Sequence, residues 1–101
     1  MQIIIGHEQA QELRKKYTVL FLETITKDGV TVDAYCVVPA EKINLGEMAN
    51  LEQNQQLHQE FANAAAVGNY ERCQELYEHL HGRFGGELDS YYDEILARTK
   101  Y

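Results

Sequence analysis

The sequence predicts one small α+β domain in which a β-hairpin packs with about four short helices. Two observations predict this class. Residues 17–39 hold two runs rich in β-branched and aromatic residues on either side of an Asp-Gly pair, which is the usual composition of a hairpin. From residue 44 onward the apolar residues recur at the spacing of a helix.

The length and composition indicate a single domain. A chain of 101 residues with 45% hydrophobic and 25% charged residues can build one core, and its single proline leaves no proline-rich linker. We expect one domain over residues 1–101, with an N-terminal helix and the hairpin in residues 1–43 and a three-helix portion in residues 44–101.

The first elements are a short strand and a helix. The apolar run Ile3-Ile4-Ile5 can add a third strand to the hairpin, and Gly6 ends it. Residues 7–16 then have the periodicity of a helix whose acids come early and whose bases come late, the order that suits the helix dipole. With the later segments, the expected order is β-α-β-β-α-α-α.

The hairpin strands are expected at residues 17–26 and 30–39. If Thr26 pairs with Val30, each strand places apolar residues on both faces of the hairpin, and a register shifted by one residue exchanges the two faces. In the first register one face contains Leu20, Leu22, Val30, Val32, Ala34, Cys36 and Val38, and the other contains Val19, Phe21, Ile25, Tyr35 and Val37.

Both faces of this hairpin need cover, because both are largely apolar. Helices can cover one face, and the other needs a further layer or a second subunit. The sequence therefore favours a homodimer. The candidate interface residues are Val19, Phe21, Tyr35, Val37 and His58.

Three helices are expected in the second half. The first helix runs to Val67. Gly68 suits the end of that helix and Asn69 suits the start of the next one, which spans residues 70–81. The last helix follows residues 83–86. Their apolar stripes contain Leu51, Leu57, His58, Phe61, Ala62 and Ala65, then Tyr70, Cys73, Leu76, Tyr77 and Leu80, then Leu88, Tyr91, Tyr92, Ile95 and Leu96.

The charge is acidic and unevenly placed. The net charge is −7; residues 1–46 carry six acids against five bases, whereas residues 47–97 carry ten acids against two bases. Such a helical half repels a phosphate backbone, which disfavours nucleic acid as a partner. No apolar run approaches the length of a membrane span, and the two cysteines have no disulfide or metal spacing. We expect a cytoplasmic protein with free thiols and no cofactor.

Three residues are the strongest candidates for chemistry. If Glu23 and Asp33 face each other across the hairpin, one of them can have a raised pKa and act as a general acid. The alternative register places Thr24 opposite Asp33 instead. His58 lies level with His79 in an antiparallel helix pair, but it falls within an apolar stripe, which favours a hydrogen-bonded core or interface histidine over a metal ligand. We assign no catalytic, cofactor-binding or metal-ligating residue.

Residues 68–73, Gly-Asn-Tyr-Glu-Arg-Cys, followed by Tyr77, resemble the turn and second helix of a tetratricopeptide repeat. Upstream the pattern fails, since Leu57 and Phe61 stand where an aromatic and a small residue are usual. Only one copy is present, and such repeats need neighbours to bury their faces. The resemblance implies a helical hairpin and no peptide-binding solenoid.

Residues 6–23 and 85–96 are similar to small uncharacterised proteins of contractile-tailed cyanobacterial phages. This resemblance implies expression in the cytoplasm of a bacterial host. It brings no activity and no site residues, and it favours a small protein that binds a host or phage protein.

The leading hypothesis is a non-enzymatic protein-binding or regulatory module that forms a homodimer. One alternative is a small enzyme or metal-dependent domain that uses His58, Glu23 or Asp33. The other is a minor structural component of a phage particle.

Overall fold

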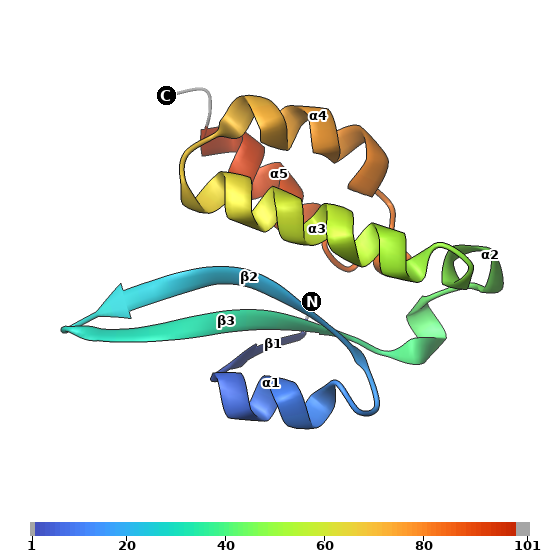
Figure 1. Ribbon diagram of the computed structural model, residues 1–101, viewed down its shortest axis with the longest axis horizontal. Helices are drawn as coiled ribbons and strands as arrows, with labels where there is room; N and C mark the ends of the chain where they lie inside the picture. Colours follow the sequence, from blue (N-terminus) through green and yellow to red (C-terminus); the bar gives the residue numbers. More distant parts are fainter. Residues whose placement is uncertain (1, 99–101) are drawn as a thin grey trace.

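The computed structural model, which describes residues 2–98, has three layers, with a sheet between one helix and a group of helices (Figure 1). The sheet is antiparallel with the strand order β1-β3-β2, where β1 is Gln2–Ile5, β2 is Thr18–Lys27 and β3 is Val30–Val38. Helix α1 (His7–Leu13) covers one face. The predicted α+β class is confirmed, and so is the third N-terminal strand.

The helical layer on the other face contains one more element than expected. Its helices are α2 (Leu45–Met48), α3 (Leu51–Ala66), α4 (Tyr70–Leu80) and α5 (Asp89–Ala97). Sequence periodicity predicted one continuous helix here, but the chain turns at Ala49-Asn50 and separates the one-turn helix α2 from α3. The Asn44 side chain accepts a hydrogen bond from the Glu47 N–H at 2.7 Å, which gives α2 a start of its own.

Helices α3 and α4 form the predicted helical hairpin. Gly68 has a φ of 75°, a conformation that favours glycine after a helix end, and the Asn69 side chain accepts a hydrogen bond from the Arg72 N–H at 3.3 Å. The two helices pack against each other, with α3 next to the sheet and α4 on the side of α3 away from it (Figure 1). The Cys73 thiol contacts the Phe61 carbonyl oxygen across their interface at 3.6 Å.

The hairpin register differs between its two halves. Near the turn Lys27 pairs with Val30 across the two residues Asp28 and Gly29, so the predicted pairing of Thr26 with Val30 is wrong. The pairing of Thr24 with Asp33, the alternative left open, is the one observed. Far from the turn, Phe21 lies opposite Tyr35 and Val19 opposite Val37, as the first register predicted.

A β-bulge at Leu22 reconciles the two registers. The register shifts between Phe21 and Glu23, which leaves Leu22 as an extra residue on β2. Leu22 belongs to the core beneath the helices, and Glu23 pairs with Arg98, the residue that follows α5, so both side chains face the helical layer. Ile25 also lines a cavity on that side, contrary to its predicted place beside Phe21.

Two separate clusters of buried residues hold the layers together. The smaller contains Ile4, Ala10, Val19, Tyr35 and Val37 and lies between the sheet and α1. The larger lies between the sheet and the helical layer and contains Leu20, Leu22, Cys36, Val38, Ile43, Phe61, Ala64, Cys73, Leu76, Leu80, Phe84, Leu88, Tyr91, Tyr92 and Ile95. The further layer that the second apolar face requires is therefore supplied by α1 of the same chain.

Candidate functional site

The residues expected at an interface lie inside the molecule. Val19, Tyr35 and Val37 are buried beneath α1, and Phe21 is half-buried with its ring 5.7 Å from that of Tyr35. His58 is 1% exposed. Because α1 and the helical layer cover these side chains, fully or, for Phe21, in part, they do not form an exposed apolar surface.

His58 joins the two layers through both of its ring nitrogens. Its Nε2 lies 2.6 Å from the Phe21 carbonyl oxygen, and its Nδ1 lies 2.9 Å from the Tyr92 hydroxyl. Since a carbonyl oxygen only accepts, Nε2 carries the proton and Nδ1 accepts the hydrogen bond of the Tyr92 hydroxyl. The neutral imidazole thus satisfies both of its nitrogens, and His58 is the hydrogen-bonded core histidine that one interpretation of the sequence predicted.

The helical layer also bonds the next carbonyl of the bulge. The Tyr91 hydroxyl donates to the Leu22 carbonyl oxygen at 2.9 Å, so side chains of α3 and α5 hold the carbonyls of Phe21 and Leu22. Sequence reasoning placed Tyr91 on an apolar stripe and missed this contact, because nothing in the sequence marks Leu22 as a bulge. The His58–Tyr91–Tyr92 cluster fixes the distance between sheet and helices.

Burial makes the imidazole of His58 difficult to protonate. Loss of solvent lowers its pKa from 6.5 to about 4, and the bond to the Phe21 carbonyl opposes this shift only in part. Burial raises the pKa of the Tyr92 hydroxyl, which stays a donor throughout the ordinary pH range. The cluster carries no charge at neutral pH.

Acidification is expected to destabilise the protein through this histidine. In the unfolded chain the His58 ring binds a proton near pH 6.5, whereas in the folded protein it does so only near pH 4. The free energy of unfolding is therefore highest above pH 6.5 and falls as the pH drops from 6.5 toward 4, because protons then bind preferentially to the unfolded chain. Between pH 7 and 5 we expect His58 to remove about 2 kcal/mol from the free energy of unfolding, measured by urea denaturation. The variant His58→Gln, which has no titrating ring, should lose less over the same interval; an equal loss contradicts this assignment.

The other candidates for chemistry do not converge. The Thr24 hydroxyl donates to the Asp33 carboxylate at 2.8 Å, whereas Glu23 lies 3.7 Å from the Arg98 guanidinium. Glu23 lines two cavities, and neither of them includes Asp33 or His58. Among residues 2–98 no three histidine, cysteine or acidic side chains are placed to hold a metal ion.

Both thiols are buried in the larger core. Burial raises the pKa of the Cys36 thiol to about 11 and also raises the pKa of the Cys73 thiol. A thiol that stays protonated at neutral pH is a poor nucleophile and a poor metal ligand. The two cysteines act as small apolar core residues.

The free edge of β1 carries exposed apolar side chains. Ile3 and Ile5 are each 53% exposed, while Ile4 between them is buried against α1. The two exposed side chains line a cavity of about 130 Å³ that α5 closes with Tyr91 and Ile95. Sequence analysis identified this run only as a strand; the signal it overlooked is that a triple isoleucine presents apolar residues to both faces of a sheet.

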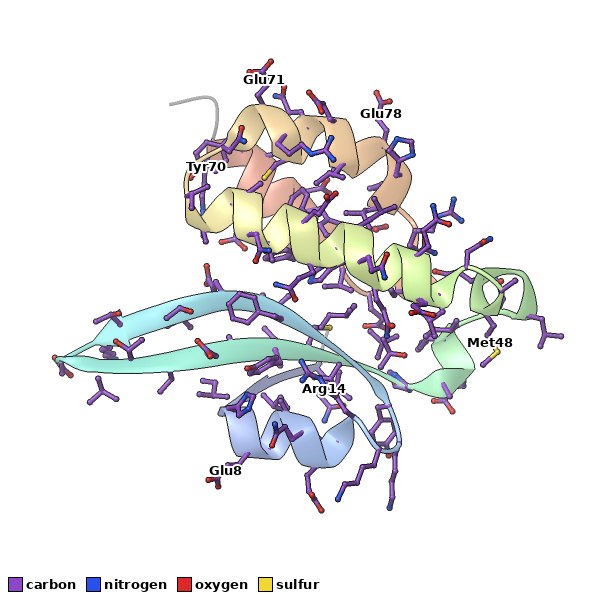
Figure 2. All side chains as sticks on the ribbon, in the orientation of Figure 1. Glu8, Arg14, Met48, Tyr70, Glu71 and Glu78 are labelled. Atoms are coloured by element: carbon purple, nitrogen blue, oxygen red, sulfur yellow. The ribbon has the colours of Figure 1, made fainter. Side chains whose placement is uncertain are left out.

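The outer surface of the helical layer is acidic. Glu71 and Glu78 project from α4 away from the sheet (Figure 2). Near them Arg72 forms ion pairs with Glu60 at 3.1 Å and Glu75 at 2.8 Å, all exposed. Such exposed pairs contribute little to stability, so this surface mainly confers negative charge.

Comparison with protein-family models, with curated proteins and with solved structures finds no match to this chain. Within residues 2–98, none of the helices has the length and apolar character that crossing a membrane requires.

Proposed function

We propose that this chain is a non-enzymatic protein-binding module that forms a homodimer through the edge of β1. The observation that carries the proposal is the exposed pair Ile3 and Ile5 on an edge strand beside an apolar cavity. An edge strand with apolar side chains invites pairing with another strand unless charges, proline or a bulge protect it. Residues 2–5 contain none of these.

The backbone of β1 is suited to pairing with a second copy of itself. The Gly6 N–H donates to the Asp33 carbonyl oxygen of β3. Hydrogen-bonded positions alternate along an antiparallel pair, so the backbone of Ile4 also bonds to β3. The backbone groups of Ile3 and Ile5 therefore face the open edge. An antiparallel pair centred on Ile4 sets Ile3 of each copy against Ile5 of the other. This arrangement is a two-fold symmetric interface, the commonest kind in homodimers.

The proposed dimer also joins the apolar surfaces that remain exposed. Four isoleucine side chains meet next to the two cavities, on the side of the sheet that carries the helices. Residues 2–5 of β1 carry no charge. Two acidic molecules can therefore pair along this edge without placing like charges opposite each other in the two strands.

Light scattering over a dilution series tests the dimer. We expect a mass of twice 11.6 kDa at high concentration and a return toward 11.6 kDa on dilution. Ile5→Lys should raise the dissociation constant at least tenfold, because it places a charge within the proposed contact, opposite Ile3 of the other copy. The matched control Val67→Lys changes a residue that is 79% exposed at the end of α3 and should leave the dimer intact. A mass of 11.6 kDa at every concentration, or equal effects of the two substitutions, contradicts the proposal.

A further inference from the structure

The opposite edge of the sheet borders a larger cleft with a different chemistry. This cleft has a volume of about 490 Å³ and lies between β2, α3 and the end of α1. Residues 18–21 of β2 form one wall, Gln55 and Gln59 of α3 form another, and Arg14 and Tyr17, which follow α1, also line the cleft. None of these side chains belongs to the β1 edge, so the two surfaces can be tested separately.

The wall formed by β2 presents free backbone groups to the cleft. His58 bonds to the Phe21 carbonyl from α3, which shows that the backbone groups of Phe21 point away from β3. Backbone orientation alternates along a strand, so the N–H and C=O of Val19 point the same way. Outside the pairing with β3, no described residue donates to or accepts from the backbone of Val19. An extended chain laid along this edge can therefore continue the sheet.

The opposite wall supplies side-chain amides. Gln55 is half-buried and Gln59 is exposed, and Gln59 Nε2 donates to Asn63 Oδ1 of the same helix at 3.0 Å. Each amide has one acceptor and two donor hydrogens, which match the backbone of an extended chain without selecting its side chains. This wall favours a peptide over a compact ligand.

The charge that lines the cleft is positive. Arg14 is the only charged residue that lines it, and among the described residues no carboxylate forms an ion pair with its guanidinium. Arg14, labelled in Figure 2, directly follows α1. Its guanidinium lies 5.7 Å from the centroid of the Tyr35 ring, a cation–π contact. Lys15 and Lys16 follow it in the chain. The cleft is therefore locally positive in a protein whose net charge is −7.

We propose that this cleft binds an extended, acidic segment of a partner protein, which adds to β2 as a fourth strand and places a carboxylate against Arg14. The backbone of Val19 and the two glutamine amides hold the main chain of the segment. Arg14 supplies the specificity, because a guanidinium pairs with a carboxylate through two parallel hydrogen bonds. The proposal is independent of the proposed dimer, which uses the other edge of the sheet.

Selection from a display library of random ten-residue peptides tests the site. The full chain is immobilised as wild type, as Arg14→Glu and as the control Lys27→Glu, which makes the same charge change at the hairpin turn. Peptides recovered with wild type and with Lys27→Glu should be enriched in aspartate and glutamate, and Arg14→Glu should reduce their recovery at least tenfold. Absence of such enrichment, or equal recovery with Arg14→Glu, overturns the proposal.

Titration of one recovered peptide locates the contact. Its binding should shift the backbone amide signals of Val19 and Phe21 in a nitrogen–proton NMR spectrum, weaken as salt is raised from 50 to 500 mM, and persist in Ile5→Lys. Arg14→Gln, which removes the charge without reversing it, should weaken binding less than Arg14→Glu. Shifts confined to Ile3 and Ile5 would assign the peptide to the β1 edge and overturn the proposal while leaving the dimer surface in place.

Discussion

His58→Leu is expected to lower the free energy of unfolding by about 3 kcal/mol, because it leaves two buried polar groups without partners. Leucine fills a similar volume, so the packing around position 58 is largely kept and the cost comes from the Phe21 carbonyl and the Tyr92 hydroxyl. Tyr92 is fully buried, which removes water as a replacement partner for its hydroxyl. Urea denaturation at pH 7 measures the loss.

Two further variants separate hydrogen bonding from packing at this site. His58→Gln keeps a donor directed at the Phe21 carbonyl and should recover part of the lost stability. In the double variant His58→Leu with Tyr92→Phe, the orphaned hydroxyl is absent, so the combined loss should be smaller than the sum of the two single losses. Additive losses would show that the bond between His58 and Tyr92 contributes nothing to stability.

Gly85→Ala is expected to cost about 3 kcal/mol, through backbone strain and a steric clash together. Gly85 has a φ of 67°, and a Cβ atom built on it would lie 2.3 Å from the Lys42 carbonyl oxygen. That oxygen belongs to the short 3-10 turn Ala40–Lys42, which packs directly against the turn Phe84–Gly86. The two turns must separate to admit the methyl group.

The matched control for this substitution is Gly82→Ala. Gly82 has a φ of 84°, but a Cβ atom there has nothing within 4 Å. It should show only the cost of the left-handed conformation, about 1 kcal/mol. Thermal and urea denaturation of both variants test the difference; equal losses would mean that the approach of Gly85 to Lys42 does not constrain the fold.

The local elements were largely predictable because their signals are local. Asp28 and Gly29 form the expected hairpin turn, and Asn69 caps α4 as its side chain indicated. The register was not predictable, because the two halves of the hairpin have different registers. The turn sets the pairing near Lys27, the hydrophobic pattern sets the pairing beyond Phe21, and the bulge at Leu22 makes the two compatible. Neither requirement alone reveals the extra residue.

The surfaces were harder to predict than the elements. Sequence analysis assigned Val19, Tyr35 and Val37 to an interface because it could not place α1 over them. The two surfaces now proposed depend on which strands lie at the edges, and strand order is a long-range property that no local pattern of β1 or β2 encodes. His58 was placed correctly within an apolar stripe, which is a local signal, but the sequence left open whether that stripe faces the core or an interface.

The bulge at Leu22 also determines when the hairpin can reach its final form during synthesis. Its two carbonyls are bonded by side chains 37 and 69 residues further along the chain. A ribosome releases the hairpin long before it releases Tyr91, so the nascent strand must leave the Leu22 carbonyl to water until α5 has emerged. The last helix therefore supplies the final hydrogen bond of the bulge, and a chain that stops before residue 91 leaves the Leu22 carbonyl to water.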